Sequence, residues 1–229
     1  MFELGLVDQL VGRTGFCIHP AAALKRISKV GGTKDVNLKK IRALAPTHVI
    51  VNVDENTKET ADALAEFVPN LIVTHPLAPL DNLTLYRQIG SAFGKVREAE
   101  ALCARFELAF RETQKQEFPR KNVLYLIWKD PWMTVSRDTY ISRTLALFGL
   151  QTVPAGSNAR YPRLDNLDVD GVELVLLSTE PYRFREQHRN ALQAELRKNV
   201  HLVDGEMTSW YGPRAIQGLR YLAGFAASL

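Results

Sequence analysis

Two apolar segments separated by a helix-length segment constrain the fold more than any other feature of this sequence. Residues 47–53 are apolar and rich in β-branched side chains, which is typical of a buried strand, and residues 71–74 are similar. Residues 57–67 between them have the length and polarity of a surface helix. A strand, a helix and a second strand in this order form a βαβ unit with parallel strands and a right-handed crossover. The sequence therefore predicts an α/β fold.

The second half of the chain repeats this alternation without repeating the sequence. It predicts strands over 122–128, 173–178 and 200–203, and helices over about 139–148, 186–198 and 214–227. Residues 129–134 are expected to form a loop, and residues 204–205 a turn.

A long polar helix is predicted between the two halves. Its apolar residues recur at three- and four-residue steps over 96–116, and such a helix would span about 30 Å. We therefore expect two α/β lobes with mainly parallel sheets, joined by one long backbone helix. The predicted division is an N-terminal lobe over 1–79, linking helices over 80–118 and a C-terminal lobe over 119–229.

In the first lobe, the sequence also predicts a helix over 2–10, a strand over 14–17 and a helix over 37–44. Residues 54–56 are expected to cap the helix that follows them, and Asp81 the next one. Cys17 and Cys103 are predicted to be buried small hydrophobic residues.

Composition excludes several classes of protein. The chain of 229 residues is 46% hydrophobic and 24% charged, which is ordinary for a globular protein. Its 29 basic and 25 acidic residues are dispersed, so no nucleic-acid partner is predicted. No apolar run reaches about 18 residues, so no membrane-spanning segment is expected. The first residues lack the basic start of a signal peptide, and the chain as written would stay in the cytoplasm.

Aromatic residues concentrate where predicted strands end. In open α/β sheets, ligands bind outside the carboxyl ends of the strands. The residues of this kind are Trp128, Trp132, Tyr182, Trp210 and Tyr211. Some of them could simply cover the core, since tryptophan and tyrosine are often half-buried. Three tryptophans in or beside such loops nevertheless favour a flat, apolar ligand.

Catalytic and metal-binding motifs are absent from the sequence. Gly31-Gly32 lacks the lysine of a phosphate loop, and there is no G-x-S-x-G segment. The histidines lack the spacing of a zinc motif. His48 and His201 are interpreted as structural and His188 as solvated, whereas His19 and His75 follow strands and are ligand candidates. We predict no catalytic residue, no bound metal and no cofactor.

Several segments together resemble a known family. They are residues 11–20, 29–33, 37–46, 55–56, 125–135, 160–162, 178–184 and 203–214. In this order they are similar to the substrate-binding proteins with a helical backbone between two lobes, which carry cobalamin, haem or ferric siderophores to ABC importers. The resemblance implies that residues 96–116 form the backbone helix and that a metal chelate is held as cargo in the cleft between the lobes.

The resemblance also implies roles for individual residues. His19 takes the place of an aromatic residue that packs on the corrin ring in cobalamin-binding members, Trp210 matches another, and Trp132 lies in a loop lining the cleft. The predicted ligand-binding residues are His19, Pro20, His75, Trp132, Tyr182, Trp210, Tyr211 and Arg214. The family docks onto its permease through an exposed acid on each lobe, for which Glu55 or Glu59 is the candidate on the first. The matching acid of the second lobe is missing, and Glu180 or Glu206 is its expected substitute.

The start of the chain departs from the family pattern. Members open with a signal peptide and a first strand, whereas residues 1–6 resemble the helix that comes later, so the chain is either truncated or a cytoplasmic relative.

The sequence therefore predicts a monomeric receptor of an ABC importer that binds a metal chelate, with cobalamin favoured over haem and ferric siderophore. Its location is periplasmic by resemblance and cytoplasmic if the start is genuine. An enzyme acting on a tetrapyrrole or metal centre, with His19 or His75 as ligand or base, is the alternative, and a cytoplasmic chelate buffer is another.

Overall fold

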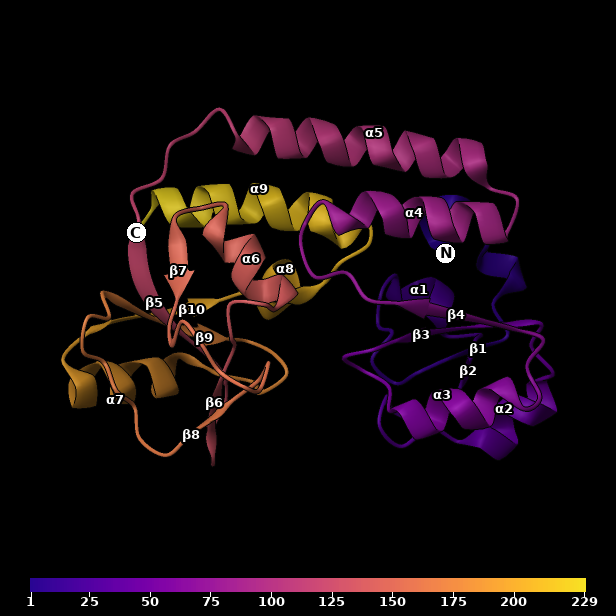
Figure 1. Ribbon diagram of the computed structural model, residues 1–229, viewed down its shortest axis with the longest axis horizontal. Helices are drawn as coiled ribbons and strands as arrows, with labels where there is room; N and C mark the ends of the chain where they lie inside the picture. The colour runs from indigo at the N-terminus through magenta and orange to yellow at the C-terminus, as the bar shows by residue number, and fades with distance from the viewer. The chain divides into compact units, whose positions relative to one another are not determined.

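The predicted βαβ unit is present. In the computed structural model, which describes residues 1–229, β3 (His48–Asn52), α3 (Lys58–Ala65) and β4 (Asn70–Thr74) follow one another, and the two strands are parallel (Figure 1). Their register pairs His48 with Asn70 and Asn52 with Thr74. The chain divides into two compact units, 1–75 and 76–229. The predicted α/β class is confirmed.

The first unit surrounds a small core. Its remaining elements are η1 (Phe2–Leu4), η2 (Val7–Gln9), β1 (Gly12–Arg13), α1 (Ala21–Leu24), β2 (Ser28–Lys29) and α2 (Leu38–Leu44). Strands β1 and β2 pair in parallel. The buried residues Val30, Ile41, Val51, Leu64 and Val68 pack together between these elements and the βαβ unit.

Three expectations for the start of the first unit are wrong. Residues 2–10 form two short 3₁₀ helices because Gly5 adopts a left-handed conformation, with φ of 66°, and ends the first after one turn. The strand of this region lies at residues 12–13, and residues 14–17 form a loop instead, which is exposed at 15–17. Cys17 is consequently exposed, whereas Cys103 is buried as predicted.

The polar residues after β3 form a turn and do not cap α3. The Asn56 side-chain oxygen accepts a hydrogen bond from the Asn52 backbone N–H at 3.0 Å, and the Asn52 side-chain oxygen accepts one from the Asp54 N–H at 2.9 Å. The N-cap is Thr57, whose hydroxyl accepts from the Thr60 N–H.

The second unit contains a six-stranded sheet. Its strands are β5 (Lys121–Trp128), β6 (Trp132–Thr134), β7 (Leu150–Thr152), β8 (Arg163–Leu164), β9 (Leu174–Ser178) and β10 (Asn199–Val203). The order is β10-β9-β5-β6-β8, with β7 also paired to β5. Strands β10, β9, β5 and β7 are parallel, whereas β6 runs back along β5. The loop expected over 129–134 is therefore partly a strand, because Thr134 pairs with Leu126 and Met133 with Trp128 of β5.

Helices cover both faces of this sheet (Figure 1). The helices of this unit are α4 (Asp81–Ala92), α5 (Val96–Thr113), α6 (Tyr140–Ala146), α7 (Glu186–Leu196), α8 (Gly205–Ser209) and α9 (Arg214–Ala227), of which α5 packs on α4 and α9. Val123, Tyr125 and Ile127 of β5 point toward the core beneath α5 and α9, and the alternate residues Leu124 and Leu126 point toward α7. Burial of both faces explains why residues 122–128 are apolar without alternation.

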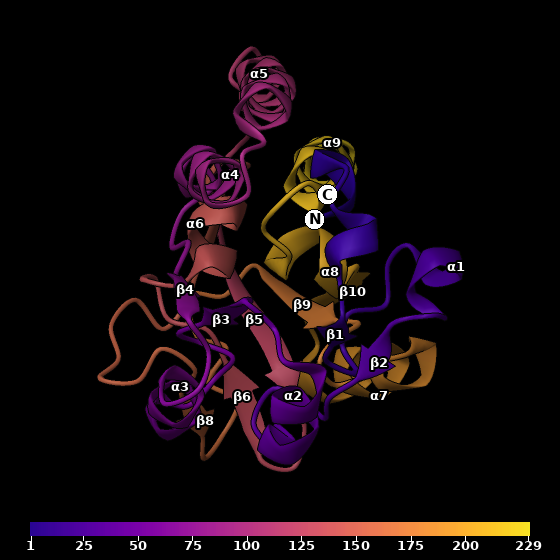
Figure 2. The same cartoon turned by 90° about the vertical axis from the view of Figure 1, so that its right-hand side faces the viewer.

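The long helix is present and belongs to the second unit. Helix α5 lies alongside α4, and the two views agree on this arrangement (Figure 2). Its buried residues Leu102, Cys103, Phe106 and Ala109 follow the predicted stripe. None of the helices is both long and apolar enough to cross a lipid bilayer.

Candidate functional site

An arginine supports the loop that carries His19 and Pro20 in the first unit. Both residues are exposed and directly precede α1. The Arg13 guanidinium donates hydrogen bonds to the carbonyl oxygens of Thr14, Cys17 and Leu24 at 3.2, 2.9 and 3.3 Å. One planar donor group thus fixes the backbone on either side of His19.

We expect Arg13→Lys to loosen this loop, because an ammonium group lacks the fork that reaches all three carbonyl oxygens. Amide hydrogen exchange over residues 14–24 should accelerate by about tenfold, since each local hydrogen bond contributes about 1 kcal/mol. Arg120→Lys, at an exposed position, is the control and should leave exchange unchanged. Equal exchange in both variants would contradict the supporting role of Arg13.

His75 and Asp54 meet at the end of β3 and β4. The His75 Nε2 lies 3.5 Å from the Asp54 carboxylate. Asn52 holds this end of the sheet together, since its amide nitrogen donates to the Thr74 carbonyl at 3.0 Å. The adjacent Glu55 is exposed, as is Glu59 in the first turn of α3. The predicted docking acids of the first unit are therefore accessible.

Trp210 is held by side chains from two other segments of the second unit. Its indole N–H donates a hydrogen bond to the Glu180 carboxylate at 2.5 Å. The Arg214 guanidinium lies over the indole ring, 5.4 Å from its centroid, and forms an ion pair with Glu206. Three predicted residues, Trp210, Arg214 and Glu180, are thus in one group.

The backbone beside Trp210 is also fixed, by a buried asparagine of α4. The Asn82 side chain accepts a hydrogen bond from the Gly212 N–H at 2.6 Å and donates to the Tyr140 hydroxyl at 3.0 Å. The Tyr86 hydroxyl donates to the Gly212 carbonyl at 2.8 Å. Tyr211, another predicted residue, packs edge-on against Tyr140 with ring centroids 5.9 Å apart.

Trp132 and Tyr182 belong to a second group, which we call the aromatic cluster. It comprises Trp128, Trp132, Tyr182, Phe184 and His188. Phe184 is buried at the centre of the cluster. Its ring is stacked on that of Trp132, with centroids 6.2 Å apart, and tilted against that of Tyr182, with centroids 4.6 Å apart. The interpretation of His188 as merely solvated is wrong, because its ring packs on Tyr182 and Phe184 and its Nδ1 accepts from the Arg185 N–H.

One connection, residues 179–185 between β9 and α7, contributes to both groups. Glu180 reaches Trp210, and two and four residues later Tyr182 and Phe184 enter the aromatic cluster. Beneath it, the Tyr125 hydroxyl donates to Ser178 at 3.0 Å and lies 2.6 Å from the Thr208 hydroxyl. Complete burial raises the pKa of Tyr125 to about 12, so this layer stays neutral.

The geometry disfavours a docking role for Glu180. Its side chain is half-buried and accepts hydrogen bonds from Trp210 and from the Ser209 hydroxyl at 2.9 Å. Sequence reasoning did not identify Asn82 or Phe184. Asn82 carries no motif, while the aromatic spacing of Tyr182 and Phe184 was a signal that could have identified the latter.

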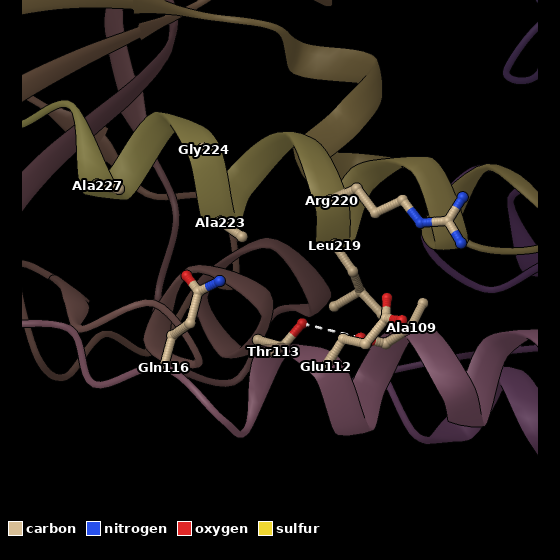
Figure 3. A pocket seen from close by; sticks show the side chains of 9 residues that line it. All are labelled: Ala109, Glu112, Thr113, Gln116, Leu219, Arg220, Ala223, Gly224 and Ala227. Carbon is tan, nitrogen blue, oxygen red and sulfur yellow. Dashed lines mark hydrogen bonds between the residues drawn. The ribbon is translucent and has the colours of Figure 1, made fainter.

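A separate groove of about 370 Å³ lies between α5 and α9 (Figure 3). Its walls are mostly small side chains, among them Ala109, Ala223 and Gly224. It includes none of the predicted ligand residues. No group of three or more histidine, cysteine, aspartate or glutamate residues is arranged to hold a metal ion.

Comparisons with known proteins agree with this architecture. The vitamin B12-binding protein of Pectobacterium atrosepticum is 23% identical over 181 residues, covering 73% of this chain and 62% of that protein. The protein of the same name from Vibrio vulnificus is 25% identical over 190 residues, which cover 82% of this chain and 67% of that protein. The chain thus matches less than two thirds of the length of the first relative.

Solved structures share the fold at low identity. The periplasmic vitamin B12 binding protein BtuF of Vibrio cholerae superposes with a TM-score of 0.82 at 15% identity, covering 99% of this chain and 91% of that one. The periplasmic haem-binding protein RhuT from Roseiflexus sp. RS-1 superposes with a TM-score of 0.79 at 20% sequence identity. The match covers 98% of this chain and 94% of that one. Residues 1–170 match the family described as periplasmic binding protein, and the chain therefore belongs to that family.

Proposed function

We propose that this chain is the substrate-binding component of an ABC importer and that its cargo is a metal chelate, with cobalamin favoured over haem and ferric siderophore. Membership of the periplasmic binding protein family supports the transport role and a periplasmic location. The names of two curated relatives support cobalamin. In this role the chain binds and releases its cargo without making or breaking bonds.

The observation that carries this proposal is the fixed position of Trp210. Glu180 holds its N–H edge, Arg214 lies over its ring, and Asn82 fixes the backbone two residues later. An aromatic side chain that is already ordered loses little conformational freedom when a ligand binds. Flat, partly apolar metal complexes suit such a surface because ring faces contribute large contact areas.

Other predicted residues are assigned supporting roles in the proposal. Tyr211 lies beside Trp210, and Trp132 and Tyr182 present the outer side chains of the aromatic cluster. His19, Pro20 and His75 are the ligand candidates of the first unit. Glu55 and Glu59 are the proposed docking acids for the permease, because both are exposed.

Equilibrium dialysis against cyanocobalamin, haemin and a ferric hydroxamate tests this function. We expect saturable binding of cyanocobalamin and about tenfold weaker binding by Trp210→Ala, since a truncated aromatic anchor typically costs more than about 1 kcal/mol. Leu108→Ala is the control, because Leu108 is an exposed apolar residue of α5 outside the predicted ligand set and outside the aromatic cluster.

Three results would change the conclusion. Binding of haemin or the hydroxamate in place of cyanocobalamin would keep the receptor role and change the cargo. Binding of none of the three would overturn the proposed function, and chemical conversion of a chelate would favour the enzyme alternative.

A further inference from the structure

We propose that Glu180 is a positioning residue, which sets the orientation of the Trp210 indole and through it the affinity for the ligand. The effect on affinity rests on the proposed function, whereas the effect on Trp210 does not.

The hydrogen bonds at Glu180 converge on one atom. Its Oε1 accepts from the Trp210 Nε1 at 2.5 Å and from the Ser209 hydroxyl at 2.9 Å. The indole N–H is the only hydrogen-bond donor of a tryptophan side chain, so a bond along it restricts rotation of the ring. The Arg214 guanidinium adds a restraint at 5.4 Å from the ring centroid. Together these contacts define the plane of the indole.

Glu180 is itself held by its surroundings. The Ser178 hydroxyl donates to its carbonyl oxygen at 2.5 Å. Gly205 faces it so closely that a Cβ on this glycine would lie 2.5 Å from the Glu180 Cγ and 2.8 Å from its N. A glutamate packed this tightly transmits its position to the ring, which a flexible surface acid would not.

An ionised carboxylate at this half-buried position lowers the stability of the fold unless its hydrogen bonds compensate. Burial, the main cause, and the nearby acids raise the pKa of Glu180, while the bonds from Ser209 and Trp210 oppose the rise. The folded chain therefore holds a proton more tightly than the unfolded chain, and ionisation costs stability as pH rises through the folded-state pKa. The charged and titratable groups facing Glu180 are Asp204, Glu206, Tyr125 and, through its pair with Glu206, Arg214.

The ionised form compensates by making stronger hydrogen bonds. Bonds to a carboxylate are roughly twice as strong as bonds between neutral groups. Glutamine would retain the geometry without the charge, and alanine would remove the acceptor. Comparison of the two substitutions therefore separates the effect of the acceptor's position on the Trp210 ring from the effect of its charge.

Near-ultraviolet circular dichroism of the ligand-free chain tests the orientation of the ring directly. The contribution of Trp210 is the difference between the wild type and Trp210→Phe. We expect Glu180→Ala to lose most of this contribution and Glu180→Gln to retain it. Glu173→Ala is the control, since the Glu173 carboxylate also accepts a hydrogen bond, from the Asn122 backbone N–H at 2.8 Å, but lies at the opposite end of the sheet.

A double-mutant cycle with cyanocobalamin tests the effect on affinity. Glu180→Ala should weaken binding about tenfold, because a hydrogen bond to a charged group is lost, and Glu180→Gln should weaken it by less than about threefold. In the Trp210→Phe background the effect of Glu180→Ala should fall below about twofold, because the two residues act together.

The outcomes separate the two proposals. An unchanged Trp210 contribution in Glu180→Ala would overturn the positioning role, as would unchanged affinity or an equal loss in the Trp210→Phe background. If the wild type binds none of the chelates, the proposed function fails and the dichroism still decides whether Glu180 orients Trp210. If Glu180→Ala does not fold, Glu180→Asp serves instead: its side chain is one methylene shorter and withdraws the acceptor from the Trp210 N–H, so the Trp210 contribution should fall, whereas Glu180→Gln should retain it.

Discussion

Replacement of Asn82 with alanine is expected to lower the free energy of unfolding of the second unit by about 3 kcal/mol, because at least two buried groups lose their partner and each costs about 1–3 kcal/mol. Asn82 is 0% exposed. Its side chain bonds the Gly212 N–H, the Tyr140 hydroxyl and, at 2.8 Å, the Pro79 carbonyl. Alanine leaves no group in that space to replace any of these bonds.

Urea unfolding followed by tryptophan fluorescence measures this effect, since all three tryptophans lie in the second unit. Asn190→Ala, at an exposed position on α7, is the control and should change stability by less than about 0.5 kcal/mol. If Asn82→Ala were as stable as this control, the bonds to Gly212 and Tyr140 would contribute little, and the order of the Trp210 segment would need another cause.

Gly205→Ala is expected to destabilise the same unit by about 2 kcal/mol, as other additions to packed interiors do. The new Cβ would lie 2.5 Å from the Ser178 Oγ and equally close to the Glu180 Cγ. Alanine favours helices more than glycine does, and position 205 opens α8, so any loss of stability would come from the clash.

Gly156→Ala provides the comparison, because nothing lies within 4 Å of the corresponding Cβ. We expect Gly205→Ala, but not Gly156→Ala, to shift the urea midpoint and to reduce the Trp210 dichroism, since Glu180 must move. If Gly205→Ala kept the stability and dichroism of the wild type, the connection between β9 and α7 would be able to shift at little cost. That result would count against Glu180 as the residue that positions Trp210.

The features that the sequence predicts well are those that depend on local patterns. The βαβ unit, the buried stripe of α5 and the final helix follow from periodicity. The failures have local causes as well. Gly5 interrupts a helical pattern, and the apolar Phe16, 65% exposed, lies on a loop where a strand was expected.

Residues that act across long sequence separations were not predictable. Asn82 bonds Tyr140 and Gly212, which lie 58 and 130 positions further along the chain, and no spacing rule connects them. Glu180 was predicted as a candidate docking acid, but its contact with Trp210 was not predictable, because that contact depends on two loops that only the folded sheet brings together.

The connection between β9 and α7 has a mechanical consequence. Glu180 at its start is anchored to the Trp210 segment, and Phe184 near its end is anchored in the aromatic cluster. A segment whose two ends are both fixed cannot absorb the movement of one of its residues by local rearrangement. A displacement of the Tyr182 ring, which lies between these two fixed residues, would therefore be transmitted toward Trp210. The aromatic cluster and the group around Trp210 would then move together as one rigid surface.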